Sequence, residues 1–121
     1  LRIANGGNEK LVLGRLDIFR DWGWAPEYVD AMWRMLQLEE PQDFVIATGV
    51  CVSLETFVSS VFTRVGLQWR DHVCSDPLLF RPSDIGWSQG DARLAKQRLG
   101  WEAQTKMPEL ANMLVEAAAV R

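Results

Sequence analysis

Two stretches of the chain show apolar residues at the intervals of three and four positions that are typical of amphipathic helices. The first is expected to begin near Pro26, because proline is favoured in a first helical turn, where its missing N–H costs nothing. Its apolar stripe, which we expect to belong to the core, consists of Val29, Met32, Trp33 and Leu36. The second is expected to begin after Ser53, a good N-cap, and to stop at Gly66. Its apolar positions are Leu54, Phe57, Val58, Val61, Phe62 and Val65.

Short apolar runs between turn residues predict strands, and residues 10–14 and 68–73 form two such runs. Residues 43–49 are apolar without alternation, which suits a strand covered on both faces, as in a parallel sheet. If such a sheet is missing, this strand has an open edge and an uncovered face. We therefore expect the isolated chain to self-associate as a homo-oligomer.

Prolines and glycines between residues 75 and 90 indicate a loop with only short extended pieces. Asp91 is expected to cap a third helix that Gly100 ends. Thr105 and Pro108 are expected to open a fourth helix. The apolar residues of this fourth helix that we expect to face inward are Leu110, Met113, Leu114 and Ala117.

The composition is that of one soluble globular domain: 121 residues, of which 48% are hydrophobic and 24% charged. A net charge of −3 gives no field that would attract nucleic acid or an anionic membrane. Cys51 and Cys74 are expected to be reduced, buried thiols, and no apolar run has the length of a membrane span, so we expect a cytoplasmic protein. Because the sequence begins with Leu1 rather than methionine, we expect a piece of a longer protein.

Motifs that would place a nucleotide cofactor or a catalytic metal are missing from the sequence. It contains no G-x-G-x-x-G, no Walker-type loop and no H-E-x-x-H. Tyr28 is followed four residues later by Met32, not by the lysine of a tyrosine–lysine pair. His72 is the single histidine, and a structural role is the better interpretation. We therefore expect no catalytic, cofactor-binding or metal-binding residue in this chain.

Two arginines lie in sequences that indicate unusual backbones. Arg20 precedes Asp21-Trp22-Gly23, and Arg81 precedes a proline. An arginine fork can clamp a diphosphate, and a nearby carboxylate can accept hydrogen bonds from ribose hydroxyls. The alternative is that Arg20 pairs with Asp21 or a helix end and that Arg81 is a surface loop residue. Residue types alone favour this alternative, and they favour packing over base stacking for the tryptophans.

Several segments, taken together and in order, carry a family resemblance that no single one would support. They are LVLGRLDIFRDWGWAPEYVDAMWRMLQ, DFVIATG, LLFRPSDI and GDARLAKQRLGW. They resemble the C-terminal part of the GDP-mannose 4,6-dehydratases, which belong to the extended short-chain dehydrogenase/reductase family. The resemblance implies an α/β fold for residues 1–121 as a single segment. This would be a mainly helical C-terminal substrate-binding portion, with a few short strands that complete or flank a Rossmann-type sheet absent from this chain.

The resemblance also implies a chemistry for the complete enzyme. Such enzymes use NADP to convert GDP-mannose to GDP-4-keto-6-deoxymannose, a precursor of GDP-fucose. Their glycine-rich loop and catalytic residues lie in the N-terminal part, so we expect no cofactor on this segment alone and no turnover by the isolated chain. By match of motif, Arg20 and Arg81 would contact the diphosphate and ribose of GDP. Asp84 would take the place of a ribose-binding carboxylate.

Three positions depart from the family pattern. Asp84 stands where the family has the longer glutamate, Arg15 replaces an asparagine, and Glu55 reverses the charge of an arginine. Two other functions stay open from the sequence. One is a non-catalytic nucleotide-binding or interaction module, and the other is a different nucleotide-sugar dehydratase or epimerase of the same family.

Overall fold

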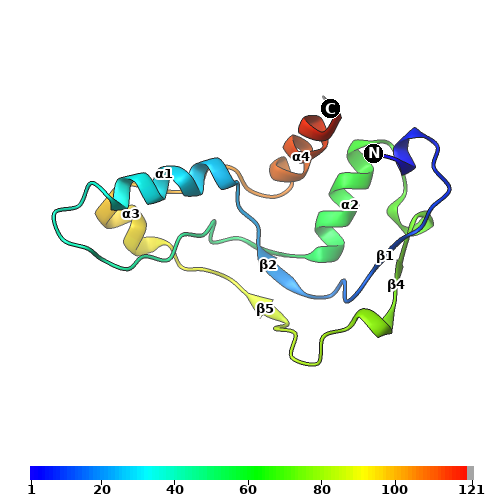
Figure 1. Ribbon diagram of the computed structural model, residues 1–121, viewed down its shortest axis with the longest axis horizontal. Coiled ribbons are helices and arrows are strands. Elements are labelled where there is room, and N and C mark those ends of the chain that lie inside the picture. The colour runs from blue at the N-terminus through cyan, green and yellow to red at the C-terminus, as the bar shows by residue number, and fades with distance from the viewer. Residues whose placement is uncertain (120–121) are drawn as a thin grey trace.

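The computed structural model describes residues 1–119 as short helices and strands joined by long irregular segments (Figure 1). The 3₁₀ turns are η1 Ile3–Asn5, η2 Trp69–Asp71 and η3 Pro77–Leu79. The strands are β1 Leu11–Leu13, β2 Phe19–Asp21, β3 Cys51–Ser53, β4 Val73–Ser75 and β5 Trp87–Ser88. The helices are α1 Ala25–Met35, α2 Leu54–Arg64, α3 Arg93–Leu99 and α4 Glu109–Ala119. The α/β class is thereby confirmed. None of the helices within residues 1–119 is long and apolar enough to cross a membrane.

The strands form two small sheets rather than one. β1 runs parallel to β4, with Leu11 opposite Val73. The second sheet has the order β3-β2-β5, in which β3 is antiparallel and β5 parallel to the central strand. β2 and β3 were not anticipated from the sequence, which indicated only a turn before the first helix. This unanticipated central strand carries Arg20 and Asp21.

The prediction of a strand over residues 43–49 is wrong for this structure. The segment runs as a coil between α1 and β3 (Figure 1), and none of its residues belongs to a strand. A strand is defined by its neighbour, and the part of the chain that the structure describes supplies none here. The prediction of a strand over residues 68–73 is also wrong in its bounds, because η2 occupies most of that range and β4 begins at Val73.

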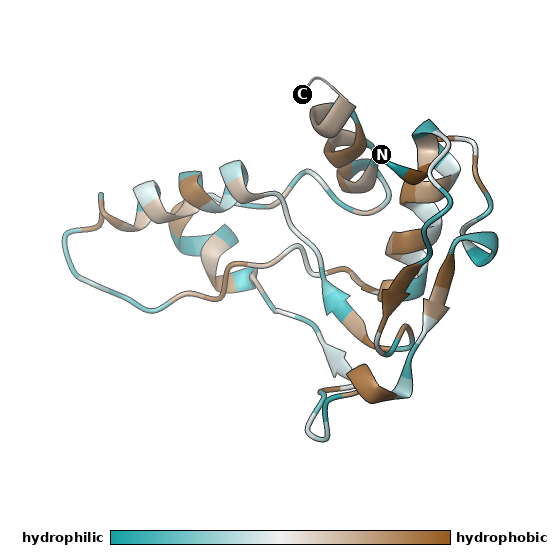
Figure 2. Cartoon of the chain, turned by 45° about the vertical axis from the view of Figure 1, so that its right-hand side comes forward, coloured by the Kyte–Doolittle hydropathy of each residue, from teal (hydrophilic) through white to brown (hydrophobic). Residues whose placement is uncertain are grey.

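The buried side chains form two separate clusters. One joins α1, α3 and the segment after α3 through Ala31, Ala95, Trp101 and Ala103. The other joins α2 to β4 through Val58, Phe62 and Val73, and β1 packs against it (Figure 2). Both clusters are small, which is consistent with the long irregular connections between elements.

Helix α1 has its expected extent but not its expected orientation. Its predicted core stripe is largely solvent-exposed: Val29, Met32, Trp33 and Leu36. Ala31 is instead fully buried and meets Ala95 of α3, while Tyr28 packs against the same cluster. Small side chains at this contact allow the two helices to approach closely. Asp30 and Arg34, four positions apart on α1, form an ion pair at 2.9 Å.

Helix α2 confirms the sequence prediction most closely. The Ser53 hydroxyl accepts a hydrogen bond from the Thr56 amide at 3.0 Å, as an N-cap does. Gly66 follows the helix with a φ of 74°, a left-handed conformation that glycine adopts without strain. Val58 and Phe62 are buried, as expected for its apolar face.

Helix α3 begins and ends as predicted, whereas α4 buries only part of its predicted inward face. Gly100 ends α3 with a φ of 62°, and Asp91 accepts a hydrogen bond from the first amide of the helix. In α4 the predicted inward residue Leu110 is buried, whereas Leu114 and Ala117 are exposed.

Cys74 is also exposed, although both cysteines are free thiols as expected. The expectation of buried thiols was therefore wrong.

Two carboxylates hold irregular segments against the regular elements. The Asp21 carboxylate accepts hydrogen bonds from the Thr48 hydroxyl at 2.7 Å and from the amides of Thr48 and the following glycine at 2.8 and 2.9 Å. The Glu27 carboxylate accepts from the hydroxyl and amide of Thr105 and from the amide before it. Both threonines are buried. We call these two arrangements the carboxylate clamps.

Removing one clamp should destabilise the fold. Asp21→Ala leaves a buried hydroxyl and two amides without their charged acceptor, so the free energy of unfolding should fall by about 2–3 kcal/mol. Urea denaturation followed by tryptophan fluorescence measures this change. Asp17→Ala is the control, because Asp17 is an exposed carboxylate that pairs with Arg15 at the surface, and its loss should leave stability nearly unchanged. Equal losses in the two variants would contradict the clamp.

Candidate functional site

The alternation of side chains along β2 gives its two charged residues different neighbours. Successive residues of a strand point to opposite faces, so Arg20 lies on one face and Phe19 and Asp21 on the other. Phe19 stacks on Trp87 with ring centroids 4.9 Å apart. Asp21 reaches the segment at Thr48. Arg20 points instead to the loop before β5. The alternative that Arg20 pairs with Asp21 is therefore wrong.

The turn after β2 brings Gly23 close to the ring of Tyr28. A Cβ at Gly23 would overlap the hydroxyl of Tyr28, which leans back from the first turn of α1 over the turn. Burial raises the pKa of the Tyr28 hydroxyl, with smaller contributions from the charges of Asp21 and Glu27. The hydroxyl therefore stays neutral over the physiological pH range.

The guanidinium of Arg20 makes three hydrogen bonds in the structure. One terminal nitrogen donates to the carbonyls of Phe19 and Ile85 at 2.7 and 2.6 Å, and the other donates to the Asp84 carboxylate at 3.0 Å. The Arg20 and Asp84 side chains are only 28% and 16% exposed, so water screens their attraction weakly. The structure thus brings together two of the three predicted site residues. They lie 64 positions apart in the sequence.

Arg81 lies at the start of the turn that presents Asp84. The Asp84 amide donates to the Arg81 carbonyl at 3.2 Å, which closes a turn of four residues. Arg81 is exposed, and within residues 1–119 its guanidinium has no hydrogen-bond or ion-pair partner. Arg20 of β2 thus binds the end of this turn at Asp84, while Arg81 at its start keeps its guanidinium unpaired among the described residues.

Arg15, one of the departures from the family pattern, contributes to the same charged region. Its guanidinium makes two hydrogen bonds to Asp17, at 2.9 and 2.6 Å. Hydrogen bonding to Asp17 raises the pKa of Arg15, and the nearby charge of Asp84 adds a smaller effect in the same direction. The hydrogen bond from Arg15 likewise lowers the pKa of Asp17. Asp17 was not singled out from the sequence, although its spacing of two from Arg15 is a signal that could have found it.

The other charged and aromatic candidates have structural partners. Glu55 forms an ion pair with Arg70 at 3.1 Å, so the reversed charge at this position is neutralised locally. His72 stacks on Phe62 with ring centroids 5.7 Å apart, in agreement with a structural role. Trp101 is buried, and its indole N–H donates to the Glu27 carbonyl at 2.9 Å. Packing is thus confirmed as the role of this tryptophan.

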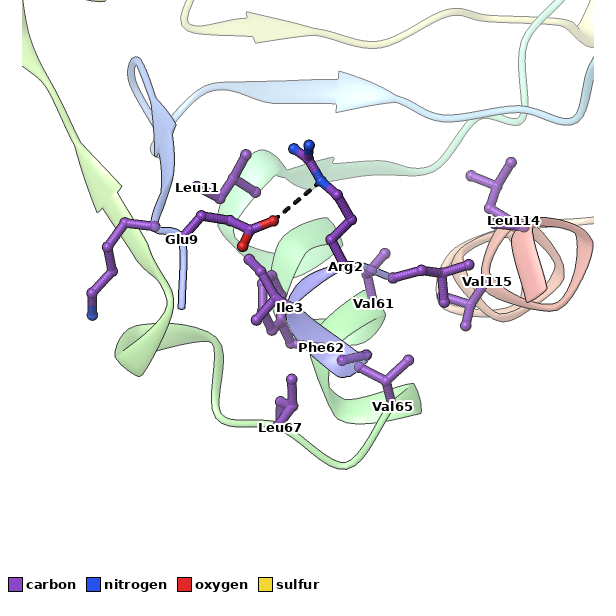
Figure 3. A pocket seen from close by; sticks show the side chains of 14 residues that line it. Arg2, Ile3, Glu9, Leu11, Val61, Phe62, Val65, Leu67, Leu114 and Val115 are labelled. Atoms are coloured by element: carbon purple, nitrogen blue, oxygen red, sulfur yellow. Dashed lines mark ion pairs between the residues drawn. The ribbon is translucent and has the colours of Figure 1, made fainter. Parts of the chain in front are cut away.

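A cavity of about 360 Å³ lies elsewhere, between η1, α2 and α4 (Figure 3). Ile3, Phe62 and Leu67 line its apolar wall, and an ion pair between Arg2 and Glu9 stands beside it. None of Arg20, Arg81 and Asp84 lines this cavity. The predicted site is therefore an exposed charged turn on a small sheet rather than an enclosed pocket.

The chemistry of this turn suits an anionic ligand with hydroxyl groups. A guanidinium held by a carboxylate can exchange that carboxylate for a phosphate, because both offer two acceptor oxygens to the fork. The released carboxylate is then an acceptor for hydroxyl donors. Arg81 adds a positive charge that no neighbour among the described residues neutralises.

Residues 1–114 match the family model described as GDP-mannose 4,6 dehydratase. A curated relative, GDP-mannose 4,6 dehydratase 2 from Arabidopsis thaliana, is 45% identical over 115 residues, which cover 95% of this chain and 31% of that protein. The chain thus spans about a third of the length of the curated relatives it matches.

Two solved structures share the fold. RMD from Pseudomonas aeruginosa, solved with NADPH, has a TM-score of 0.82 at 14% identity, over 95% of this chain and 38% of that protein. UDP-glucose 4-epimerase from Bifidobacterium longum, solved with NAD+ and UDP, has a TM-score of 0.81 at 17% identity, over 99% of this chain and 38% of that protein. At such identities the likeness concerns the fold alone.

The Arg20–Asp84 pair should show strong energetic coupling. In a double-mutant cycle of Arg20→Ala and Asp84→Ala, the coupling free energy should be about 1–3 kcal/mol, because both groups are largely buried and either single change leaves the other charge unpaired. Urea denaturation of the four proteins measures it. The exposed pair Arg64–Glu116, at a similar distance of 2.8 Å, is the control and should couple by less than about 1 kcal/mol. Similar values for the two pairs would show that Arg20 does not anchor the turn.

Proposed function

The chain belongs to the GDP-mannose 4,6-dehydratase family, and we propose that it forms the C-terminal sugar-nucleotide-binding portion of a longer dehydratase. In that protein it binds GDP-mannose for NADP-dependent conversion to GDP-4-keto-6-deoxymannose. The observation that carries the proposal is the ion pair between Arg20 of β2 and Asp84, which lies in the turn that begins at the exposed Arg81. The UDP bound in the epimerase structure of the same fold supports a nucleotide diphosphate as the ligand type.

Binding is proposed to proceed by exchange of ion-pair partners. Arg81 takes the diphosphate first, because its guanidinium is exposed. A phosphate oxygen then replaces the Asp84 carboxylate on the Nη2 of Arg20, while the two backbone carbonyls keep holding Nη1. Asp84 is released to accept hydrogen bonds from the ribose hydroxyls. The shorter aspartate suits this role because the turn already lies against Arg20.

The residues of this chain do not fit a dinucleotide site. The pair Gly6-Gly7 follows the 3₁₀ turn η1 rather than a strand, and no helix begins after it. We therefore propose that NADP, which supplies the hydride chemistry of the family, is held by other parts of the longer protein, and that this segment alone neither binds it nor turns over. The two free thiols, Cys51 and Cys74, support the proposed cytoplasmic location.

A non-catalytic nucleotide-binding or interaction module is the second candidate. The same charged turn would support it, since the anion binding proposed for the turn does not depend on a reaction that follows. A different nucleotide-sugar dehydratase or epimerase is the third candidate, and the match of the family model over residues 1–114 favours the GDP-mannose enzymes over it.

Calorimetry with GDP and with UDP tests the ligand. GDP should bind, and Arg81→Ala should weaken binding by about 1.5–3 kcal/mol through loss of a charge-assisted contact. Arg2→Ala is the control, because Arg2 is equally cationic and exposed but lies beside the apolar cavity, and it should leave affinity unchanged. Equal effects of the two substitutions would contradict the site, and tighter binding of UDP would favour another nucleotide-sugar enzyme.

The proposed homo-oligomer has support in uncovered apolar side chains of α1. Leu36 is 81% exposed and continues a stripe with Trp33 and Val29. Sedimentation velocity across micromolar concentrations should show species larger than a monomer, and Leu36→Glu should shift the distribution towards the monomer. A clean monomer at every concentration would contradict self-association.

A further inference from the structure

Two connecting segments lead from the sheet of β1 and β4 to the sheet of β2 and β5 (Figure 1). Residues 14–18 form the first segment and residues 76–86 contain the second. Both strand pairs are parallel, so the two segments run in the same direction. Near their start, a Cβ on Gly14 would lie 3.0 Å from the carbonyl oxygen of Leu79. Because β2 and β5 are paired at the other end, the two segments lie side by side.

This arrangement places Arg15 beside the residues of the candidate site. Arg15 lies on the first segment, next to the segment that carries Arg81 and Asp84. The charge of Asp84 contributes to the raised pKa of Arg15, which agrees with a short separation between the two side chains. Arg20, just after the first segment, pairs with the same carboxylate. Three arginines therefore lie along two adjacent segments, with Asp84 among them.

The backbone on both sides of Arg15 is fixed by hydrogen bonds. The Ser75 hydroxyl donates to the Gly14 carbonyl at 2.8 Å, and the Glu55 amide in the first turn of α2 donates to the Leu16 carbonyl at 3.0 Å. A side chain carried by an ordered backbone loses less conformational entropy when it binds a ligand. Arg15 is therefore held ready for a contact rather than ordered by it.

The guanidinium of Arg15 is oriented and still has free donors. Its Nε and Nη2 donate to the Asp17 carboxylate at 2.9 and 2.6 Å. A guanidinium carries N–H groups on each of its nitrogens, and within residues 1–119 the Nη1 of Arg15 makes no hydrogen bond. Asp17 thus fixes the plane of the guanidinium, while Nη1 stays available to an acceptor on a ligand.

This arginine is peculiar to the chain, because the family pattern has asparagine at position 15 and arginine at position 55. The hydrogen bond from the Glu55 amide to the Leu16 carbonyl makes the two positions neighbours in space. The side chain of Glu55 is itself paired with Arg70 at 3.1 Å. At this pair of neighbouring positions, Arg15 therefore supplies the positive charge, which an asparagine there could not offer to an anion.

We infer that Arg15 is a third arginine of the nucleotide site, and that its Nη1 donates to the diphosphate proposed to bind Arg20 and Arg81. The inference rests on the proposed function. A diphosphate has oxygens on both phosphorus atoms, so it can accept from several guanidinium groups at once. Guanine also accepts hydrogen bonds from arginine, but the diphosphate is favoured because an anion reduces the repulsion between neighbouring arginines.

Calorimetry with GDP and with inorganic pyrophosphate tests this assignment. Arg15→Asn, which restores the residue of the family pattern, should weaken both ligands by about 10-fold or more, the loss of one charge-assisted hydrogen bond. Arg93→Asn is the matched control, because Arg93 is exposed and likewise donates to an aspartate two positions away, Asp91, but lies at the start of α3. It should leave both affinities unchanged. Circular dichroism establishes that the two variants keep the fold.

The two ligands separate failure of this inference from failure of the proposed function. Unchanged pyrophosphate affinity in Arg15→Asn, or an equal loss in Arg93→Asn, would overturn the inference. A loss for GDP alone would also overturn it, because Arg15 would then contact the base or the ribose. If the wild-type chain binds pyrophosphate through Arg15 but does not bind GDP, the inference holds and the proposed function fails. If the wild-type chain binds neither ligand, both fail.

Discussion

The carboxylate clamps of Asp21 and Glu27 are the interactions on which the rest of this structure depends. Residues 36–50 and 100–108 contain no helix or strand, so no periodic hydrogen bonding fixes their path. Each clamp joins a buried threonine and two amides of one such segment to a regular element. Because the hydrophobic clusters are small, these directional bonds decide where the irregular segments lie.

The clamps also explain why one short strand can serve both the fold and the candidate site. On β2 the side chain of Asp21 anchors the neighbouring segment, while the side chain of Arg20, one position earlier, leaves from the opposite face. Arg20 is thereby directed to the turn at Asp84 and the Ile85 carbonyl. A change of register by one residue would exchange these roles, so the pairing of β2 with β3 and β5 controls the charged turn.

Sequence patterns predicted what is local and missed what depends on partners. Helix α2 was predicted with its cap and its end because spacing, Ser53 and Gly66 lie within the element itself. The stripe of α1 was predicted to share a face, but spacing cannot show whether anything covers that face. Strands of three residues such as β2 carry no periodic signal. Arg20, Arg81 and Asp84 came from the family resemblance, whereas the ion pair across 64 positions needed the structure.

The contrast between the charged turn and the apolar surfaces has a physical basis. Arg20 and Asp84 neutralise each other, so their site keeps its shape without a ligand. Exposed apolar side chains such as Trp33 and Val45 cannot be stabilised by pairing within the chain in this way, because only a packed neighbour removes them from water. A fold whose charged side chains are paired and whose apolar side chains stay exposed therefore leaves a surface that a packing partner would stabilise.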